Sequence, residues 1–500
     1  MPTQKARLLS SPSSDESHGY GTIRPDGGAD DGDVITSPME RKKEKRDNAV
    51  AHYIAYPQRW VVLAAFSFLS FMNNWCWITW SPLALPLSEY WHVHTSKVDD
   101  LSAVFMYVYI PLSFPALLAL HKYKLTWGLW VGGTLNFVGA LVRYWKMESY
   151  PWVYLGTFLC ACCQTLTLAM PPLISTSWFQ EKERGLATSL GVLANQLGSA
   201  FGLGVTIIVD FSASSTASST TVLDPGQQDM MDTSTIREST LRQYLGLQMI
   251  LSALSLVLIA VFVRSNAPPT PPSEAASQQK STVSYLESIR LFLVTNHPSG
   301  SILCIVYGLA VGVLYALATF LSQFFVGNHA MASGSWTETE AGYLGMLLIM
   351  AGLPGSILAG EWLDKTKHQE HRRISIAYLL FSFGSVTGFL FFLEFQACDR
   401  WLAYLTIACM GFFLTGFITV GFEYGTAISY PADEAAVAGV LNVAAQIGGW
   451  VLVMVGGRVG AGETLNAVLA TSVFVALLLL VFFVRAKSAR PSDGTSITIP

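Results

Sequence analysis

Long runs without a charged residue alternate with short charged clusters along most of the chain. Read as helices, these runs give twelve candidate spans, which lie near residues 58–88, 100–120, 125–145, 150–178, 184–209, 243–264, 299–326, 340–361, 373–394, 401–427, 435–458 and 464–485. A helix needs about 20 apolar residues to cross the hydrocarbon core of a bilayer. The pattern therefore predicts an all-α, polytopic membrane protein with 12 transmembrane helices.

Polar segments divide these spans into two sets of six. The stretch "NAPPTPPSEAASQQKST" lies at the centre of the chain, and its proline and polar residues do not suit a packed core. We therefore expect five regions. They are a disordered cytosolic tail (1–56), an N-terminal six-helix bundle (57–264), a central cytosolic loop (265–297), a C-terminal six-helix bundle (298–487) and a second cytosolic tail (488–500).

An internal repeat relates the two bundles. Residues 178–198 read "WFQEKERGLATSLGVLANQLG" and residues 428–448 read "ISYPADEAAVAGVLNVAAQIG". At a constant offset both contain an acidic loop, a small-residue helix start and a Gln-x-Gly sequence. The fifth and eleventh spans are therefore predicted to be equivalent. Two pseudo-symmetric six-helix bundles describe the major facilitator fold, whose substrate site lies near the membrane midplane between the halves.

Composition and charge agree with a membrane location. Of the 500 residues 51% are hydrophobic and only 13% are charged, against about 25% in a typical soluble protein. Basic residues gather before the first span, in the loop at 365–373 and after the last span, so both termini are predicted to be cytosolic. The tail motif "YGTI" and the Leu8–Leu9 pair leave two addresses open, the plasma membrane and an endolysosomal or vacuolar membrane.

Motifs of catalysis and of metal or nucleotide binding are missing from the sequence. There is no GxxxxGK[ST], no HExxH and no Ser/His/Asp arrangement, and the cysteines inside apolar runs are interpreted as packing residues. We expect no enzyme, no catalytic residue, no metal and no cofactor. The expected partners are a small-molecule substrate and the lipid bilayer, with no nucleic acid, and the chain is expected to be a monomer.

Large rings and amides lie deep inside charge-free spans. Trp77 lies nearly 20 residues into the first span, and Tyr315 lies well inside the equivalent seventh span. The remaining candidates are amides near the middle of the fifth and eleventh spans: Asn195, Gln196, Asn442 and Gln446. No carboxylate stands at the midplane. Ring faces hold a quaternary ammonium such as choline by cation–π attraction, and amides orient a hydroxyl. The alternative is that the amides only hydrogen-bond helices together.

Charged residues near the cytosolic span ends are candidates for gating. Glu423 lies in "GFEYG" near the cytosolic end of the tenth span, and a carboxylate within a membrane segment is a functional candidate. The other gating candidates are Arg184, Glu361, Asp364 and Lys365. Because no acid stands at mid-depth, facilitated diffusion is favoured over proton coupling.

Several segments resemble the feline leukaemia virus subgroup C receptor family (solute carrier family 49) of the major facilitator superfamily. They include "YPQRWVVLAAFSFLSFMNNWCWITWS", "LANQLGSAFG", "MAGLPGSILAGEWLDKTK" and "TGFITVGFEYGTAISYPADEAAVAGVLNVAAQIGG". The resemblance runs from about Tyr56 to Arg485. It implies a carrier associated with haem and choline, whose substrate contacts fall on Trp77, Tyr315, Gln196 and Gln446.

One loop departs from the family pattern. The family usually has an aspartate and a basic residue after the second span, where this chain has His121 and Lys122, whereas the C-terminal half keeps Asp364 and Lys365. Two alternatives to cation transport stay open. A haem (porphyrin) transporter would need a wide cleft with an axial ligand, and a non-transporting membrane receptor would need an ordered domain outside the membrane.

Overall fold

The apolar runs fold into helices, because a helix satisfies its backbone hydrogen bonds within one segment and so suits a lipid environment. The computed structural model describes residues 56–209, 237–270, 285–295, 298–326, 336–366, 370–394, 400–430, 432 and 434–484. Within these ranges the regular elements are helices, with no strand. The tail sorting motifs, residues 271–284 and 296–297 of the central loop and the C-terminal tail lie outside the described residues.

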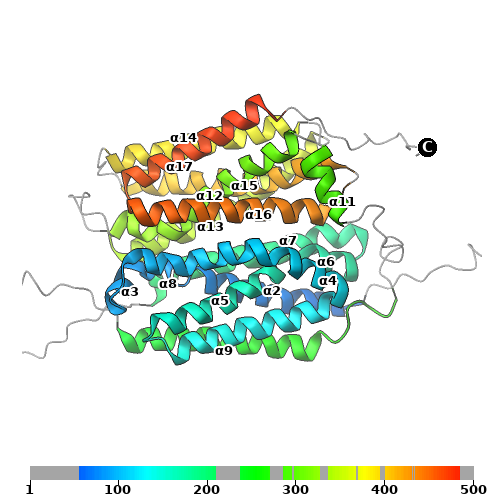
Figure 1. The fold of residues 1–500 in the computed structure, drawn as a ribbon, viewed down its shortest axis with the longest axis horizontal. Helices are drawn as coiled ribbons and strands as arrows, with labels where there is room; N and C mark the ends of the chain where they lie inside the picture. Colours follow the sequence, from blue (N-terminus) through cyan, green and yellow to red (C-terminus); the bar gives the residue numbers. More distant parts are fainter. Residues whose placement is uncertain are drawn as a thin grey trace, which may run out of the picture. The chain divides into compact units, whose positions relative to one another are not determined.

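The helices form two groups that lie against each other (Figure 1). The N-terminal half contains α2 (Gln58–Ile78), η1 (Ser81–Leu83), α3 (Ala84–Tyr90), α4 (Thr95–Trp145), α5 (Tyr150–Thr167), α6 (Met170–Trp178), α7 (Glu181–Leu203), α8 (Val205–Ile208) and α9 (Glu238–Phe262). The C-terminal half contains α11 (Tyr285–Arg290), η3 (Leu291–Thr295), α12 (Ser299–Val326), α13 (Glu338–Lys365), α14 (His371–Glu394), α15 (Arg400–Ser429), α16 (Glu434–Val459) and α17 (Glu463–Phe482).

Ten of the described helical segments are long and apolar enough to cross a membrane. The α5–α6 pair, bent by 42°, forms an eleventh. The 23-residue α7 lies at the fifth predicted span, but it is the most polar of the long helices and is not among these apolar segments. Element α4 holds two spans, Thr95–Leu120 and Lys122–Trp145, and its helical backbone is broken by the positive φ of Lys124, near the start of the second span. The predicted all-α fold is confirmed.

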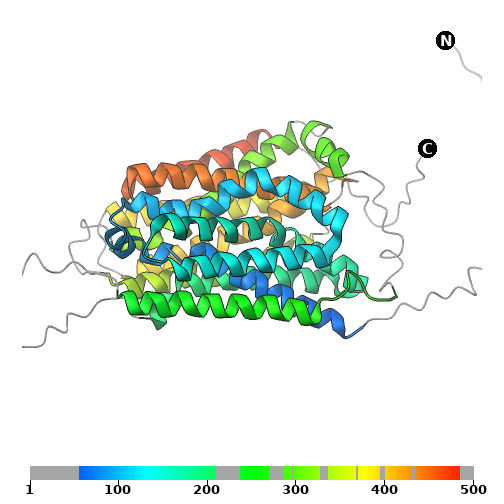
Figure 2. The same ribbon diagram turned by 60° about the horizontal axis from the view of Figure 1, so that its bottom comes forward.

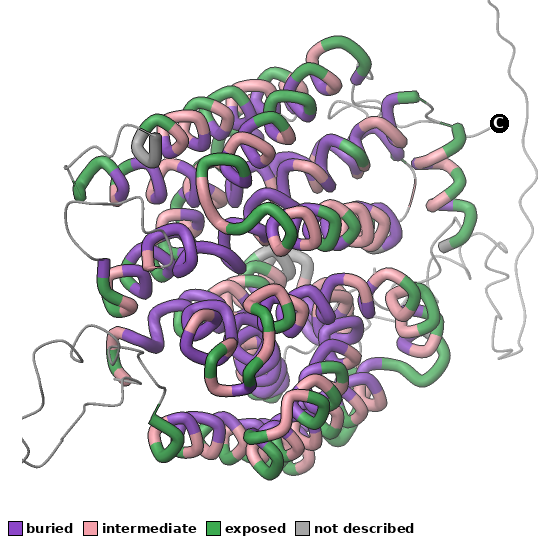
Figure 3. Tube along the Cα trace, turned by 60° about the vertical axis from the view of Figure 1, so that its left-hand side comes forward, coloured by how far each residue is buried: buried purple, intermediate pink, exposed green. Residues whose placement is uncertain are grey.

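The surface of the bundle is apolar where lipid would contact it. Helix α9 exposes Leu247, Ile250, Leu254, Val257 and Val261, which recur at the three- and four-residue spacing of one helix face. Figure 3 shows the same distribution in the whole bundle, with buried segments facing inward and exposed segments on the outside. A continuous exposed apolar stripe indicates a face in contact with the hydrocarbon core.

The first predicted span is interrupted within its charge-free run. Helix α2 ends at Ile78, and a short irregular segment and η1 follow before α3 begins at Ala84. Buried polar groups satisfy the backbone around this break. The Arg143 guanidinium donates to the Cys76 carbonyl oxygen at 3.2 Å, and the Thr79 hydroxyl donates to the Trp75 carbonyl oxygen at 2.8 Å. Just after the break, Ser81 of η1 hydrogen-bonds the C-terminal half at Ala318 and Thr319.

Glycines allow equivalent helices to approach closely in both halves. A Cβ atom on Gly198 of α7 would clash with the carbonyl oxygen of Phe71 in α2. In the other half, a Cβ atom on Gly448 of α16 would clash with the carbonyl oxygen of Gly308 in α12. Both glycines end the repeated Gln-x-Gly sequence, so the repeat codes for one helix–helix contact made twice. Small residues at membrane helix interfaces commonly serve this purpose. Figure 2 shows the two halves from a second side.

Candidate substrate site

A cavity lies between the two halves and receives side chains from six helices. It is lined by Asn74, Trp77, Gln164, Leu168, Asn195, Gln196, Ser199, Leu314, Tyr315, Ala318, Ile349 and Gln446. Its volume of about 30 Å³ suffices for one or two water molecules. The lining combines two aromatic rings with six amide or hydroxyl side chains, and it includes no charged residue.

The two predicted rings meet across the boundary between the halves. The ring centroids of Trp77 and Tyr315 are 5.5 Å apart, and their planes lie at 72° in an edge-to-face arrangement. The Trp77 indole N–H donates to the carbonyl oxygen of Ser102 at 3.2 Å, which fixes the ring's orientation. Gly449 leaves room for the Tyr315 ring, because a Cβ there would lie 2.8 Å from a ring carbon.

Trp75 faces away from the cavity. It is buried in the N-terminal half, where its indole N–H donates to the Tyr244 hydroxyl at 2.8 Å and its ring packs on Phe201. Two residues along a helix are about 200° apart around its axis. This is why Trp77 reaches the cavity while Trp75 packs within its own half.

Both glutamines of the repeated Gln-x-Gly sequence line the cavity. Gln196 is half-buried and Gln446 is buried. Each lies two residues before the glycine that brings its helix against α2 or α12. In the described part of the structure no hydrogen bond holds either side chain. Both amides are therefore free to contact a ligand.

Two other amides of the lining join α2 to α7. The Asn74 amide donates to the Asn195 carbonyl oxygen at 2.7 Å and to the Ser199 hydroxyl. The Asn195 amide in turn donates to the Ser70 hydroxyl at 3.2 Å. For Asn195, these bonds agree with the alternative hypothesis that the amides hydrogen-bond helices together. Asn195 lines the cavity, but its N–H₂ group is already engaged.

Gln164 is a cavity residue that the sequence reasoning missed. It lies on the last turn of α5, next to the bend that separates α5 from α6, and it is 5% exposed. Its Oε1 atom is buried and has no hydrogen-bond partner among the described residues. A buried amide oxygen without a partner costs about 1–3 kcal/mol, and a ligand that donates a hydrogen bond would remove that cost. The sequence feature that could have identified Gln164 is a lone amide side chain within an apolar span.

Six hydrogen bonds of the described residues join the two halves at one end of the bundle. The Ser81 hydroxyl donates to the carbonyl oxygens of Ala318 and Thr319 at 2.7 and 2.6 Å, and the Ser322 hydroxyl donates to the Ser81 carbonyl oxygen at 2.7 Å. Gln323 donates to Asp99 at 2.6 Å, and Thr206 exchanges two further bonds with Glu338 and Thr339. The cavity is closed at this end.

The amino-acid sequence is similar to those of known major facilitator proteins. A sequence profile described as Major Facilitator Superfamily matches residues 63–453. The choline/ethanolamine transporter flvcr2a of Danio rerio is 32% identical over 435 residues, which cover 85% of this chain and 85% of the relative. The chain belongs to the feline leukaemia virus subgroup C receptor family of that superfamily. The choline/ethanolamine transporter FLVCR1 of Felis catus, another member, is 33% identical over 85% of this chain and 71% of its own.

Solved structures support the fold of this family member. A D-xylose–proton symporter superposes with a TM-score of 0.62, covering 86% of this chain and 98% of the symporter, at 13% identity. The fucose transporter FucP in its outward conformation superposes with a TM-score of 0.55 at 15% identity, covering 85% of this chain and 99% of FucP. At such identities the similarity concerns the major facilitator fold alone.

The other predicted residues of this family member lie away from the cavity. Asn442 is half-buried and does not line it. Glu361 and Lys365 form an exposed ion pair of 3.4 Å at the end of α13. Glu423 is half-buried beside Tyr424, whose ring stacks on His371 at a centroid distance of 5.9 Å. The side chains of the two remaining gating candidates, Arg184 and Asp364, lie outside the described residues.

Proposed function

We propose that this chain transports a small organic cation such as choline by facilitative uniport and alternating access. As a member of the major facilitator superfamily it is a multi-pass membrane protein and a secondary transporter of a small molecule. The observation that carries the proposal is the pair of rings, Trp77 and Tyr315, beside three unengaged amides in a cavity without a carboxylate.

This lining suits a quaternary ammonium. Such a cation donates no hydrogen bond, so ring quadrupoles attract it, each contact contributing about 1–2 kcal/mol when water is excluded. Because the centroids of Trp77 and Tyr315 are 5.5 Å apart, one cation can lie within about 6 Å of both rings. The amides of Gln164, Gln196 and Gln446 then face the hydroxyl end of the substrate.

The small cavity represents a closed state of the transport cycle. At about 30 Å³ it is too small for a cation with four carbon substituents on nitrogen, so binding requires the halves to separate. Six hydrogen bonds close one end of the bundle, so we infer that the halves separate at the opposite end to admit the substrate. Uniport is favoured because no acid that could carry a coupled proton lines the cavity.

The names of the relatives support the same substrate class. Both flvcr2a and FLVCR1 are choline/ethanolamine transporters. The haem alternative receives little support from the lining, which holds one tyrosine and no histidine, cysteine or methionine that could bind iron.

We further place both termini in the cytosol, with the chain acting as a monomer in the plasma membrane or an endolysosomal or vacuolar membrane. The starts of α2 and α14 and the end of α13 carry basic side chains, which favour the cytosolic side. This puts the closed end of the bundle on the opposite side of the membrane.

Uptake of radiolabelled choline by proteoliposomes tests the proposal. We expect saturable uptake that ethanolamine inhibits and that a pH gradient does not drive. The neutral isostere 3,3-dimethyl-1-butanol should compete poorly, because the cation–π contact requires the charge. Equal competition by this alcohol would exclude the ring-based site, and uptake of haem without uptake of choline would establish the alternative function.

A further inference from the structure

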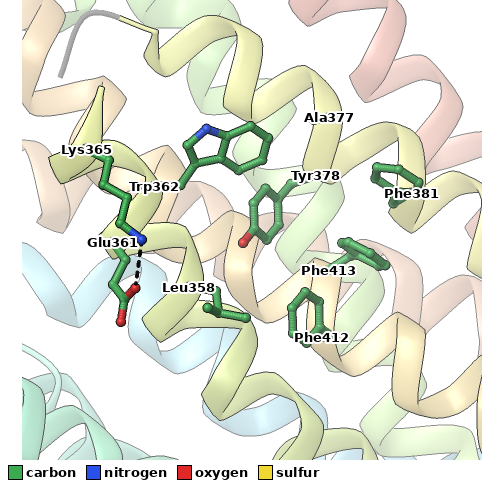
Figure 4. A pocket seen from close by; sticks show the side chains of 9 residues that line it. All are labelled: Leu358, Glu361, Trp362, Lys365, Ala377, Tyr378, Phe381, Phe412 and Phe413. Carbon is green, nitrogen blue, oxygen red and sulfur yellow. Dashed lines mark hydrogen bonds and ion pairs between the residues drawn. The ribbon is translucent and has the colours of Figure 1, made fainter. Parts of the chain in front are cut away.

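A second pocket lies on the outer surface of the C-terminal half, where α13, α14 and α15 meet (Figure 4). It has a volume of about 390 Å³ and is lined by Leu358, Glu361, Trp362, Lys365, Ala377, Tyr378, Phe381, Phe412 and Phe413. Leu358 follows Ile349, which lines the substrate cavity, by nine residues on α13. Nine residues correspond to about 180° around a helix, so the pocket faces away from the substrate cavity.

The pocket is a groove with an aromatic floor that is already packed. The Phe381 and Phe413 rings stack at a centroid distance of 4.9 Å, and Tyr378 meets Phe413 edge to face at 5.9 Å. The Tyr378 hydroxyl donates to the Gly355 carbonyl oxygen at 3.2 Å, which leaves the apolar ring toward the groove. Phe381 is 57% exposed. An apolar chain would bury these surfaces without any rearrangement of the floor.

The depth of the groove matches one leaflet of a membrane. Phe381 lies ten residues after the start of α14, which corresponds to about 15 Å along the helix. The hydrocarbon core is about 30 Å thick, so the groove reaches from the end of the bundle to near the bilayer centre. A lipid acyl chain runs over the same distance.

The rim of the groove carries one charge of each sign. Lys365 and Glu361 lie side by side, with their side chains 76% and 55% exposed, and Trp362 stands beside them with 44% exposure. An exposed ion pair four residues apart on a helix contributes only about 0.3–0.5 kcal/mol. Glu361 and Lys365 can therefore each leave this ion pair and bind a charged group of a ligand at little cost in free energy.

We propose that this groove binds a phospholipid whose headgroup carries both a phosphate and an ammonium group. The acyl chain lies on Phe381 and Phe413, the phosphate pairs with Lys365, and the ammonium group lies between the Glu361 carboxylate and the Trp362 ring. The rim fits a zwitterionic headgroup better than an anionic one, because Glu361 repels a headgroup whose only charge is negative.

Native mass spectrometry of the purified full-length protein tests this inference. The probe is an equal mixture of phosphatidylethanolamine and phosphatidylglycerol with identical acyl chains. We expect the wild type to retain phosphatidylethanolamine about two- to fivefold better, as expected for one exposed charged contact. Glu361→Gln should abolish or reverse this preference, and Ala377→Phe, which fills the groove, should lower retention of both lipids.

A second ion pair provides the matched control. Glu370 and Arg373 are exposed, bridged at 2.6 Å and close to the same end of the bundle, yet they do not line the groove. Glu370→Gln should keep the wild-type preference. Equal retention of both lipids by the wild type, or an unchanged preference in Glu361→Gln, would overturn the proposal. Loss of the preference in Glu370→Gln would also overturn it, since the effect would then reflect general surface charge.

Discussion

Gln323 donates a hydrogen bond of 2.6 Å to the Asp99 carboxylate across the boundary between the two halves, and both side chains are buried. The bond joins α12 to the start of α4 at the closed end of the bundle. Removing one partner of a buried hydrogen bond leaves the other unsatisfied, which costs about 1–3 kcal/mol. The pair is therefore a principal contact that holds this end shut.

Removing the Asp99 carboxylate should open that end. We expect Asp99→Ala to raise the labelling rate of a cysteine introduced as Thr319→Cys by about tenfold, measured with a membrane-impermeant maleimide. Thr319 is fully buried in the closed state. The neighbouring Asp100 pairs with Lys97 instead and serves as the control. An equal increase in Asp100→Ala would assign the effect to general loosening rather than to the Asp99–Gln323 bond.

Substitutions at Trp77 separate substrate binding from stability. Trp77→Ala should remove most choline affinity and Trp77→Phe only part of it, because a smaller ring keeps a weaker quadrupole. Trp75→Phe should lower thermal stability by loss of the Tyr244 hydrogen bond while keeping choline affinity. Scintillation proximity binding and a thermal unfolding assay measure the two quantities. Wild-type affinity in Trp77→Ala would exclude this ring from the site.

The sequence was sufficient to predict the spans and the two rings for a physical reason. Lipid excludes charged residues and unpaired backbone groups, so charge-free runs of sufficient length become helices. Helical geometry then separates Trp75 from Trp77 by about 200°, and the repeat identifies Gln196 and Gln446 as equivalent. These inferences depend only on spacing within one helix or on the repeat.

Features that depend on how helices cross could not be predicted. The bend after α5 brings Leu168 and Gln164 to the cavity, but no charged residue marks this bend in the sequence. Gln164 also lies outside the internal repeat, so the repeat does not identify it. Likewise, the place of Glu361 and Lys365 at a helix end predicts a gating role, but it does not reveal the outer groove that they border in the structure. The rotation of α13 about its axis, which brings them to this groove, is set by tertiary packing.

Gln164 should determine recognition of the substrate hydroxyl. Gln164→Leu removes the unpartnered amide oxygen, so choline affinity should fall about two- to tenfold, the effect of one neutral hydrogen bond. Affinity for propyltrimethylammonium, which lacks the hydroxyl, should change little. Competition binding with both cations measures the ratio. Thr165→Val alters the next residue, whose hydroxyl bonds its own helix at Cys162, and should leave the ratio unchanged. A preserved preference for choline in Gln164→Leu would remove this residue from hydroxyl recognition.

Gly448 should be indispensable for placing Gln446. A methyl group at this position would push α16 away from the Gly308 carbonyl oxygen, and overpacking of this kind costs about 1–3 kcal/mol. Gly448→Ala should therefore lower both the unfolding temperature and choline affinity. Gly384→Ala is the matched control, because a Cβ there meets nothing within 4 Å and alanine favours the helix by about 1 kcal/mol. We expect its unfolding temperature to stay the same or rise. If Gly448→Ala behaved like Gly384→Ala, the close contact between α12 and α16 would not be what positions the glutamine.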